Sequence, residues 1–210
     1  ALLYIWQGGM QGAKAVADIL SGDQSPSGKL TATIAQTYED YPTSGMSNGE
    51  KVFGGYHFSD YVEDIYVGYR YFETFAKEKV LYPFGYGLSY TEFNIKTDRI
   101  HEDKGVITLD LTVTNIGKNY SGKEVVQVYY GAPQGKLGKA ARSLIAYAKT
   151  GTLAPGESEK IQLLFKVADM ASYDEAGKTG YKSAYVLEAG RYPIYVGNSV
   201  RDAAMVGVQQ

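Results

Sequence analysis

The sequence predicts a mainly β fold, an immunoglobulin- or fibronectin III-like β-sandwich preceded by a partial α/β segment of strand, helix and strand. Two patterns lead to this prediction. The second half of the chain alternates apolar and polar residues in short stretches separated by turns, whereas the beginning passes from a continuous apolar run to a helical period. With 210 residues, 44% of them hydrophobic, the chain can bury a substantial core.

The beginning of the chain predicts the α/β segment. The run ALLYIW at residues 1–6 is continuously apolar, which is typical of a strand covered on both faces, and a Gly-rich turn follows it. An apolar stripe in residues 13–20 then predicts an amphipathic helix that ends at Gly22, and residues 26–34 predict a short strand. One such unit cannot cover a sheet on both faces, and the chain starts without Met in a strand of buried type. We therefore expect it to be part of a longer protein.

Three segments complete the first half. Residues 36–60 combine Gly, Ser, Asn, Asp and aromatic residues without a period, which predicts a long surface loop that is functional or wraps another surface. Residues 64–72, DIYVGYRYF, have strand-like composition. Residues 80–93, VLYPFGYGLSYTEF, contain closely spaced aromatic and glycine residues that fit neither a helical nor a strand period.

After Phe93 the pattern becomes that of an all-β domain. Ile107, Leu109, Leu111 and Val113 alternate with polar residues, as expected for a strand with one buried face. About seven short strands without an intervening helix predict a sandwich; the assigned ones lie at 107–113, 124–131, 142–150, 161–167, 183–188 and 191–197. Pro193 predicts that the last of these is an edge strand or carries a bulge.

Composition excludes several classes of function. Twenty-one Lys and Arg against 23 Asp and Glu give a formal net charge of -2, so there is no basic surface for nucleic acid. The absence of cysteine excludes disulfides, thiol catalysis and cysteine-ligated metals. No apolar run approaches the ~20 residues that span a bilayer, so we expect no membrane partner. Localisation stays open among bacterial cytoplasm, periplasm and secretion.

Candidate catalytic groups are sparse. His57 and His101 lack neighbours at metal-ligand spacing, so the sequence offers no metal, cofactor or Ser-His-Asp site, and we interpret both as structural. Carboxylate pairs can hydrolyse glycosides, and two acidic pairs occur, Glu39 with Asp40 and Glu63 with Asp64. Adjacent acidic residues are more often solvated or turn-forming than catalytic.

The tyrosines and a group of basic residues can each be interpreted structurally as well as functionally. The 20 tyrosines suit either core packing or a carbohydrate surface, because their rings stack on sugars while their hydroxyls form hydrogen bonds. Lys136, Lys139 and Arg142 form a small basic patch that we interpret as a solvated loop.

Four segments together resemble the C-terminal part of glycoside hydrolase family 3, the β-glucosidase and β-xylosidase family. They are WQGGMQGAKAVADILSGDQSPSGKLTATI, EDIYVGYRYFE, LYPFGYGLSYTEF and SYDEAG followed by YVLEAGRYPIYVGNSVRD, in the order of the family. The resemblance implies that residues 1–92 are the end of an α/β sandwich domain and residues 93–210 a fibronectin type III-like domain. It also implies that residues 80–93 join and dock these domains through Phe84, Tyr86 and Tyr90, with Gly85 and Gly87 permitting tight turns.

The resemblance further implies a retaining hydrolase that uses an Asp nucleophile and a Glu acid/base. No residue of this chain matches either one, so no catalytic residue is assigned, and the barrel that carries the nucleophile lies before or after this segment. Trp6 and Gln7 are candidates for the rim of the substrate pocket, although Trp6 also suits a buried core.

We therefore expect the C-terminal portion of a bacterial β-glucosidase that removes terminal β-linked sugars from oligosaccharides, and we expect this portion to be inactive by itself. Its partners would be the glycoside substrate and the missing barrel and α/β portions of the same protein. The alternatives are a non-catalytic carbohydrate-binding β-sandwich and a purely structural spacer. Polysaccharide binding by the chain alone would favour the first of these alternatives.

Overall fold

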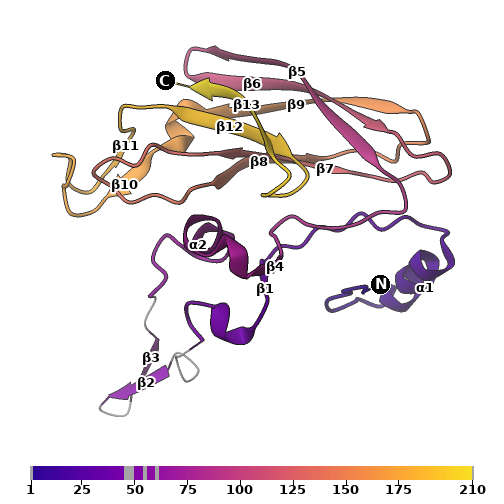
Figure 1. Cartoon of the computed structure of the whole chain (residues 1–210), viewed down its shortest axis with the longest axis horizontal. Coiled ribbons are helices and arrows are strands. Elements are labelled where there is room, and N and C mark those ends of the chain that lie inside the picture. Colours follow the sequence, from indigo (N-terminus) through magenta and orange to yellow (C-terminus); the bar gives the residue numbers. More distant parts are fainter. Residues whose placement is uncertain (1, 45–49, 54–55, 60–61, 210) are drawn as a thin grey trace.

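The computed structural model describes residues 2–44, 50–53, 56–59 and 62–209. It places a β-sandwich above a smaller and less regular N-terminal part (Figure 1). The helices are α1 (Gly12–Ser21), η1 (Tyr38–Asp40), α2 (Tyr69–Phe75), η2 (Lys77–Lys79) and η3 (Val167–Met170). The strands are β1 (Ile34–Ala35), β2 (Glu50–Phe53), β3 (Tyr56–Ser59), β4 (Val80–Tyr82), β5 (Phe93–Asp103), β6 (Val106–Asn115), β7 (Val125–Tyr130), β8 (Ser143–Lys149), β9 (Ser158–Lys166), β10 (Ser172–Asp174), β11 (Ala184–Val186), β12 (Tyr192–Gly197) and β13 (Ala204–Gln209).

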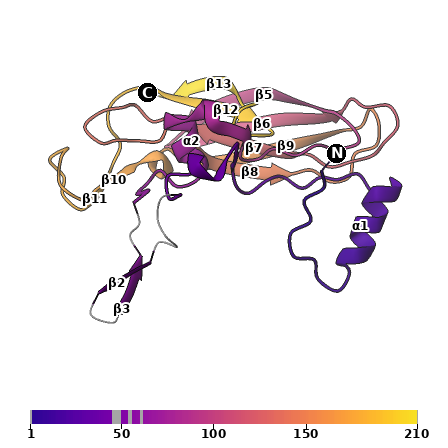
Figure 2. The same cartoon turned by 60° about the horizontal axis from the view of Figure 1, so that its bottom comes forward.

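Two antiparallel sheets form the sandwich. One has the strand order β5-β6-β9 and the other β13-β12-β7-β8, and they lie as two layers in Figures 1 and 2. The short strands β10 and β11 form a separate hairpin at one end of the sandwich. This architecture confirms the mainly β fold class.

The core lies between the two sheets and follows the alternation in the sequence. On β6, Ile107, Leu109, Leu111 and Val113 are at most 2% exposed, as the period of two requires. Apolar residues of β9 in the same sheet and of β7 and β12 in the facing sheet complete this core. The predicted strands at 107–113, 124–131, 142–150, 161–167, 183–188 and 191–197 thus correspond to β6, β7, β8, β9, β11 and β12.

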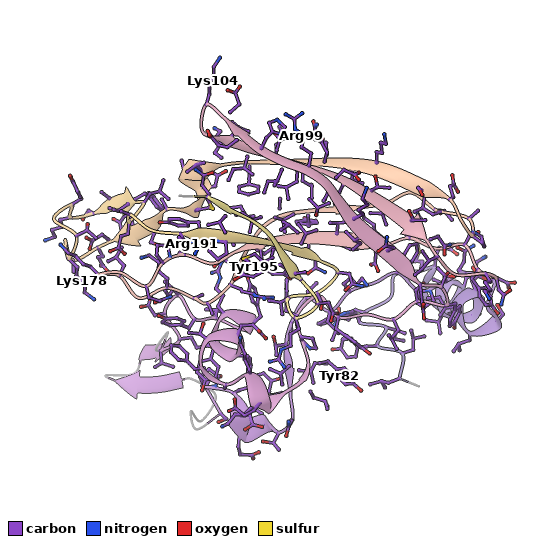
Figure 3. All side chains as sticks on the ribbon, turned by 45° about the horizontal axis from the view of Figure 1, so that its top comes forward. Tyr82, Arg99, Lys104, Lys178, Arg191 and Tyr195 are labelled. Atoms are coloured by element: carbon purple, nitrogen blue, oxygen red, sulfur yellow. The ribbon has the colours of Figure 1, made fainter. Side chains whose placement is uncertain are left out.

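Strand β5 was not among the predicted strands because its alternation is interrupted. Its pairing with β6 shifts by one residue between Thr97 and Arg99, so the apolar positions before and after this bulge fall out of phase. The strand ends in a tight hairpin in which Lys104 and Gly105 both have positive φ, 51° and 79°, as a type I′ turn requires. Figure 3 shows Arg99 and Lys104 on the outer side of this strand.

Of the two alternatives predicted for the strand containing Pro193, an edge position or a bulge, the structure shows the irregular register and not the edge. β12 pairs with β13 on one side and with β7 on the other, so it lies inside the four-stranded sheet. Pro193 is tolerated because it lies at the beginning of the strand, where its carbonyl accepts a hydrogen bond from the Gly131 N–H at 3.0 Å. An irregularity in register does follow, between Ile194 and Tyr195.

The predicted strand-helix-strand unit forms only in part. α1 matches the predicted helix and ends at Gly22, whose φ is 86°. Residues 2–6 form no strand, and the second strand is reduced to β1, which pairs with β4. A continuously apolar strand is stable only between neighbouring strands and under helices, and the described part of this chain supplies neither at residues 2–6.

The strand predicted at residues 64–72 is also wrong, because the segment forms a turn followed by α2. Tyr69, Phe72 and Ala76 lie at i, i+3 and i+7. Tyr69 packs against Tyr129 of the sandwich, whereas Phe72 and Ala76, which are 1% and 4% exposed, pack with Ala35 in a separate small cluster of the N-terminal part. This helical spacing is visible in the sequence, but aromatic composition hides it.

Within the predicted surface loop at 36–60, the structure describes η1 and the antiparallel hairpin β2–β3. The loop therefore contains more regular structure than its composition predicts. Among the described helices, none is long and apolar enough to cross a membrane.

Candidate functional site

Trp6 and Gln7 lie on the surface, immediately before α1. The ring of Trp6 is 58% exposed and packs edge-to-face on Tyr4, with ring centroids 4.6 Å apart. Trp6 also has a φ of 48°, an unusual conformation for a residue with a side chain. Trp6 is therefore not part of a core within this chain, and its indole face and the exposed Gln7 are open to a ligand or to another part of a longer protein.

The Gly-rich turn after Trp6 brings the backbone close to itself. The Gly12 N–H donates to the Gly9 carbonyl at 2.9 Å, and a Cβ on Gly8 would lie 3.1 Å from the Gly12 Cα. Glycine at position 8 thus allows the close approach of the backbone at the entry into α1.

The four candidate carboxylates have local roles. Asp40 accepts hydrogen bonds from the N–H and hydroxyl of Thr37, both at 3.0 Å, and pairs with Lys79 at 3.2 Å. Burial alone would raise the pKa of Asp40, but these hydrogen bonds and the Lys79 charge lower it. Glu39 and Asp64 are exposed, and the Glu63 carbonyl accepts the Tyr66 N–H at 2.8 Å in a turn. Nothing in this arrangement assembles an acid/base pair.

Of the two histidines, the structure describes the side chain of His101 alone. His101 lies on β5, and its Nδ1 is buried without a hydrogen-bond partner. The side chain of His57 lies outside the described part of the chain. Within that part, no group of three His, Asp or Glu residues is placed to hold a metal ion.

The best-developed site in the chain is the contact between the N-terminal part and the sandwich, built around α2 and residues 83–90. The Tyr69 ring stacks on Phe84 at 4.5 Å and meets Tyr129 of β7 edge-on at 6.2 Å. The Tyr69 hydroxyl accepts the Leu144 N–H at 2.9 Å. Tyr129 is fully buried, and burial raises the pKa of its hydroxyl far above the ordinary value. Tyr69 and Phe84 cover Tyr129 on one face of the sandwich, and these ring contacts confirm Phe84 as a docking residue.

Gly85 allows this docking segment to approach the sheet. Its φ is 82°, and a Cβ there would lie 2.3 Å from Oε1 of Gln127. Gln127 is 4% exposed and donates from its amide to the Asn198 carbonyl at 2.6 Å. A side chain at position 85 would therefore displace a buried polar group of β7.

Gly87 and Lys29 form the next contact along the same segment. A Cβ on Gly87 would lie 2.3 Å from the Gly28 carbonyl oxygen, so the two chain segments pass at backbone distance. Lys29 donates to the Gly87 carbonyl at 3.0 Å and forms an ion pair with Glu124 at 2.8 Å. The Lys29 and Glu124 side chains are 12% and 6% exposed, so this pair is mostly removed from water.

Tyr90 makes a contact with the sandwich, as predicted for a docking residue, whereas the ring contact of Tyr86 stays within the N-terminal part. Tyr86 packs against Tyr82, with ring centroids 5.4 Å apart. The Tyr90 hydroxyl donates to the Ile19 carbonyl at 2.7 Å and its ring lies 5.7 Å from that of Tyr120. Tyr90 thereby ties the end of α1 to the edge of the sandwich.

Polar contacts complete the attachment of α2. Arg201, in the loop between β12 and β13, pairs through Nε with Glu73 at 2.9 Å and donates from Nη2 to the Lys77 carbonyl at 2.7 Å. The Thr74 hydroxyl accepts the Ala141 N–H at 3.0 Å. Glu73 is 4% exposed, and Arg201 is the cation that pairs with its carboxylate.

The interpretation of Lys136, Lys139 and Arg142 as a solvated patch is wrong for two of the three. Lys139 is 4% exposed, pairs with Glu188 and donates to the Pro133 carbonyl at 2.8 Å. Arg142 lies over the Tyr195 ring at 4.2 Å and donates to the Val200 carbonyl. Lys136 remains exposed. Basic side chains here support loops and are not a binding surface.

Sequence reasoning identified Phe84, Gly85 and Gly87 of the contact but missed Tyr69, Glu73 and Arg201. The helical spacing in α2 was a usable signal for Tyr69. No pattern in the sequence pairs Glu73 with Arg201, because 128 positions separate them.

Comparison with known families identifies both parts of the chain. Residues 1–90 match the model of the glycosyl hydrolase family 3 C-terminal domain, and residues 124–200 match that of the fibronectin type III-like domain. Beta-glucosidase A of Butyrivibrio fibrisolvens is 49% identical over 98% of the chain, and the Kluyveromyces marxianus beta-glucosidase is 38% identical over the same share. The chain spans 26% and 23% of these two relatives.

Solved structures give the same result. A beta-glucosidase from Paenibacillus barengoltzii is 55% identical, with a TM-score of 0.89 over 96% of this chain and 22% of its own. Beta-glucosidase 3B from Thermotoga neapolitana, solved with α-D-glucose, is 38% identical, with a TM-score of 0.85 over 98% of this chain and 27% of its own. Relatives thus include bacterial and yeast proteins. In sequence and fold, the chain corresponds to the C-terminal part of glycoside hydrolase family 3.

Proposed function

We propose that the chain is the C-terminal part of a retaining β-glucosidase that removes terminal β-linked sugars from oligosaccharides, and that it is inactive by itself. The observation that carries this proposal is the 49–55% identity of nearly the whole chain to beta-glucosidases of which it spans only about a quarter. No residue of the chain matches the nucleophile or the acid/base of the family. The remaining sequence of a longer protein would supply both.

The surface of the N-terminal part supports this role. Leu2, Tyr4, Ile5 and Trp6 are 81%, 56%, 56% and 58% exposed, and α1 has no buried residue. Apolar side chains gathered in this way usually mark a contact surface. The remaining α/β sandwich portion would cover Leu2, Tyr4 and Ile5 and turn residues 2–6 into the strand that their composition predicts, with Trp6 at its carboxyl end.

We also propose a domain boundary between residues 92 and 93. β5 begins at Phe93, and the Glu92 carbonyl accepts the Ile116 N–H at 2.8 Å, so the sandwich starts at this point. The docking contacts of Phe84 and Gly85 attach the two domains firmly. The second domain would then fix the C-terminal end of the α/β domain relative to the rest of the enzyme.

Hydrolysis tests the proposal directly. The chain alone, a separately expressed upstream region, their mixture and the uninterrupted parent protein are compared on aryl β-glucoside and aryl β-xyloside. We expect turnover by the parent, none by the chain, and more by the mixture than by the upstream region alone. Turnover by the chain alone would contradict the proposal and direct attention back to Glu39, Asp40, Glu63 and Asp64.

Trp6 and Gln7 are proposed to line the leaving-group side of the pocket in the complete enzyme. The Trp6 indole supplies a flat apolar face for a sugar ring and Gln7 supplies hydrogen-bonding groups. Trp6→Ala and Gln7→Ala in the parent should raise KM for cellobiose about tenfold, the cost of one good contact, with little change for a small aryl glucoside. Leu20→Ala, at an exposed position of α1, is the control, and equal effects of all three variants on both substrates would contradict the assignment.

A non-catalytic carbohydrate-binding module remains the second candidate. The observation that favours it is the exposure of several tyrosines at one end of the sandwich, Tyr173, Tyr181 and Tyr185, at 52%, 67% and 77%. Deleting residues 93–210 from the parent distinguishes the two candidates, because the loss of a binding module would leave the parent's hydrolysis unchanged.

A further inference from the structure

The hairpin β10–β11 presents two aromatic side chains to solvent. Tyr173 and Tyr185 lie directly opposite each other in the strand register, with ring centroids 5.2 Å apart and planes inclined by 59°. Their exposed fractions are 52% and 77%, and neither belongs to the core between the sheets. We refer to these two residues as the tyrosine pair.

The hairpin holds the tyrosine pair on a fixed support. Asp174 is 1% exposed, on the opposite face of the strand from Tyr173. Its carboxylate accepts the N–H groups of Gly177, Lys178 and Thr179 at 2.8, 3.0 and 2.7 Å. The Ser183 N–H also donates to the Asp174 carbonyl, at 2.7 Å. The connecting loop is thereby closed onto β10, so a ligand of the tyrosine pair would not have to order it.

The charge around the tyrosine pair favours a neutral ligand. Between residues 172 and 186, Lys178 and Lys182 balance Asp174 and Glu175, so the hairpin has no formal net charge to attract an anionic or cationic partner. Tyrosine combines an apolar ring face with a hydroxyl at its edge. This combination matches the C–H faces and hydroxyl groups of a neutral sugar.

The location of the hairpin keeps it accessible. In Figures 1 and 2, β10 and β11 project from the end of the sandwich opposite α1, and Figure 3 shows Lys178 at that same end. A longer protein that covers the exposed residues 2–6 and α1 would therefore make these contacts at the end of the molecule opposite the hairpin.

We propose that the tyrosine pair is a second carbohydrate-binding site, separate from the hydrolytic pocket, for neutral β-linked glucans or oligosaccharides. This proposal rests on the proposed function, because it assumes a parent enzyme that meets such chains. The site would hold a glucan near the enzyme without contributing to the chemistry. As a shallow pair of rings it should bind weakly, with a Kd of about 1 mM.

Affinity electrophoresis of the 210-residue chain in gels containing barley mixed-linkage β-glucan tests the site, followed by titration with cellohexaose. We expect retardation of the unmodified chain, about tenfold weaker binding for Tyr173→Ala or Tyr185→Ala, and no retardation for the double variant. Tyr147→Ala is the matched control, since Tyr147 is 68% exposed on β8 and belongs to the same sandwich. Circular dichroism confirms that each variant is folded.

Three results would overturn the proposal: no retardation of the unmodified chain, unchanged retardation of the double variant, or equal loss with Tyr147→Ala. A dimer that dissociates in the double variant without any glucan binding would assign the tyrosine pair to self-association instead. Binding is measured without hydrolysis, so its failure leaves the activity test of the parent unaffected. Failure of that activity test would equally leave a measured affinity in place.

Discussion

At the scale of single residues, the docking segment at residues 83–90 depends most directly on the absence of a side chain at Gly85. Gly85→Ala would combine a left-handed backbone with a Cβ 2.3 Å from the Gln127 amide. The strained φ costs about 1 kcal/mol, and displacing a buried hydrogen-bonded amide adds ~1–3 kcal/mol. We therefore expect urea denaturation to show a loss of about 2–4 kcal/mol in the free energy of unfolding.

Gly156→Ala is the control for this change. Gly156 has a similar φ of 80°, but a Cβ there would meet nothing within 4 Å. Its substitution should cost only the backbone term, about 1 kcal/mol. Equal losses for the two variants would show that Gln127 does not constrain the docking segment.

The Asp174 carboxylate makes the free energy of unfolding depend on pH in the acid range. Its burial alone would raise its pKa, but hydrogen bonds from the Thr179 hydroxyl and from three backbone N–H groups lower the pKa to about 2. A carboxyl whose pKa is lower in the folded state stabilises fully above its unfolded pKa of about 3.9 and loses this contribution as pH falls through the folded value.

We therefore expect Asp174→Asn to lower the urea midpoint at neutral pH and the difference from the unmodified chain to shrink below about pH 4. Glu175→Gln, at the exposed neighbouring position, should show neither effect. Urea titrations across this pH range provide the measurement. A difference that stays constant down to about pH 2 would refute the role of the Asp174 charge.

At the scale of elements, α2 is held to the sandwich by an ion pair in which Glu73 is buried and Arg201 is partly exposed. Arg201→Ala would leave the Glu73 carboxylate, 4% exposed, without its cation. Breaking such a pair from one side is costly, here about 2–4 kcal/mol because Arg201 itself is 32% exposed. Amide hydrogen exchange should show α2 opening more readily, with urea denaturation giving the total loss.

The double variant Glu73→Gln with Arg201→Met tests the reason for this loss. It removes both charges and keeps most of the volume, so it should be more stable than Arg201→Ala alone. A double variant as unstable as the single one would mean that packing of Arg201, and not its charge, holds α2.

The same scale shows what the sequence can and cannot predict. β6 and β9 were predictable because one apolar residue in two faces a continuous core. β5 was missed because its bulge at Thr97–Arg99 shifts that alternation, and α2 was mistaken for a strand because aromatic residues that favour strands also fill a helix face. Residues 2–6 have strand composition without strand partners. Local pattern therefore predicted strands where the alternation is regular and the neighbouring strands lie in this chain.

The candidate site was harder to predict than the fold. Gly85 and Gly87 were identifiable as residues that permit close approach, since glycine beside aromatic residues indicates a tight turn. The tyrosine pair depends on the register of β10 and β11, and Arg201 with Glu73 depends on a contact between distant segments. Both are properties of tertiary arrangement, which spacing along one chain does not encode.

At the scale of the whole molecule, the N-terminal part divides into a region that the sandwich needs and one that it does not. α1 buries no residue. Its attachment includes one hydrogen bond, from the Tyr90 hydroxyl to the Ile19 carbonyl. Residues 69–85, in contrast, cover Tyr129, which is fully buried. Deleting residues 1–21 should therefore change the free energy of unfolding by less than about 1 kcal/mol.

Deleting residues 1–92 should cost about 3 kcal/mol or more, because it exposes Tyr129 and Val200 and leaves Glu124 without Lys29. Urea unfolding followed by circular dichroism compares both deletions with the full chain; tryptophan fluorescence is unsuitable because Trp6, the single tryptophan, is lost in each. If residues 93–210 were as stable alone as in the full chain, the docking segment would be a passive linker. If removal of residues 1–21 were as harmful as removal of 1–92, α1 would be an integral part of the sandwich and not a surface prepared for the rest of a larger enzyme.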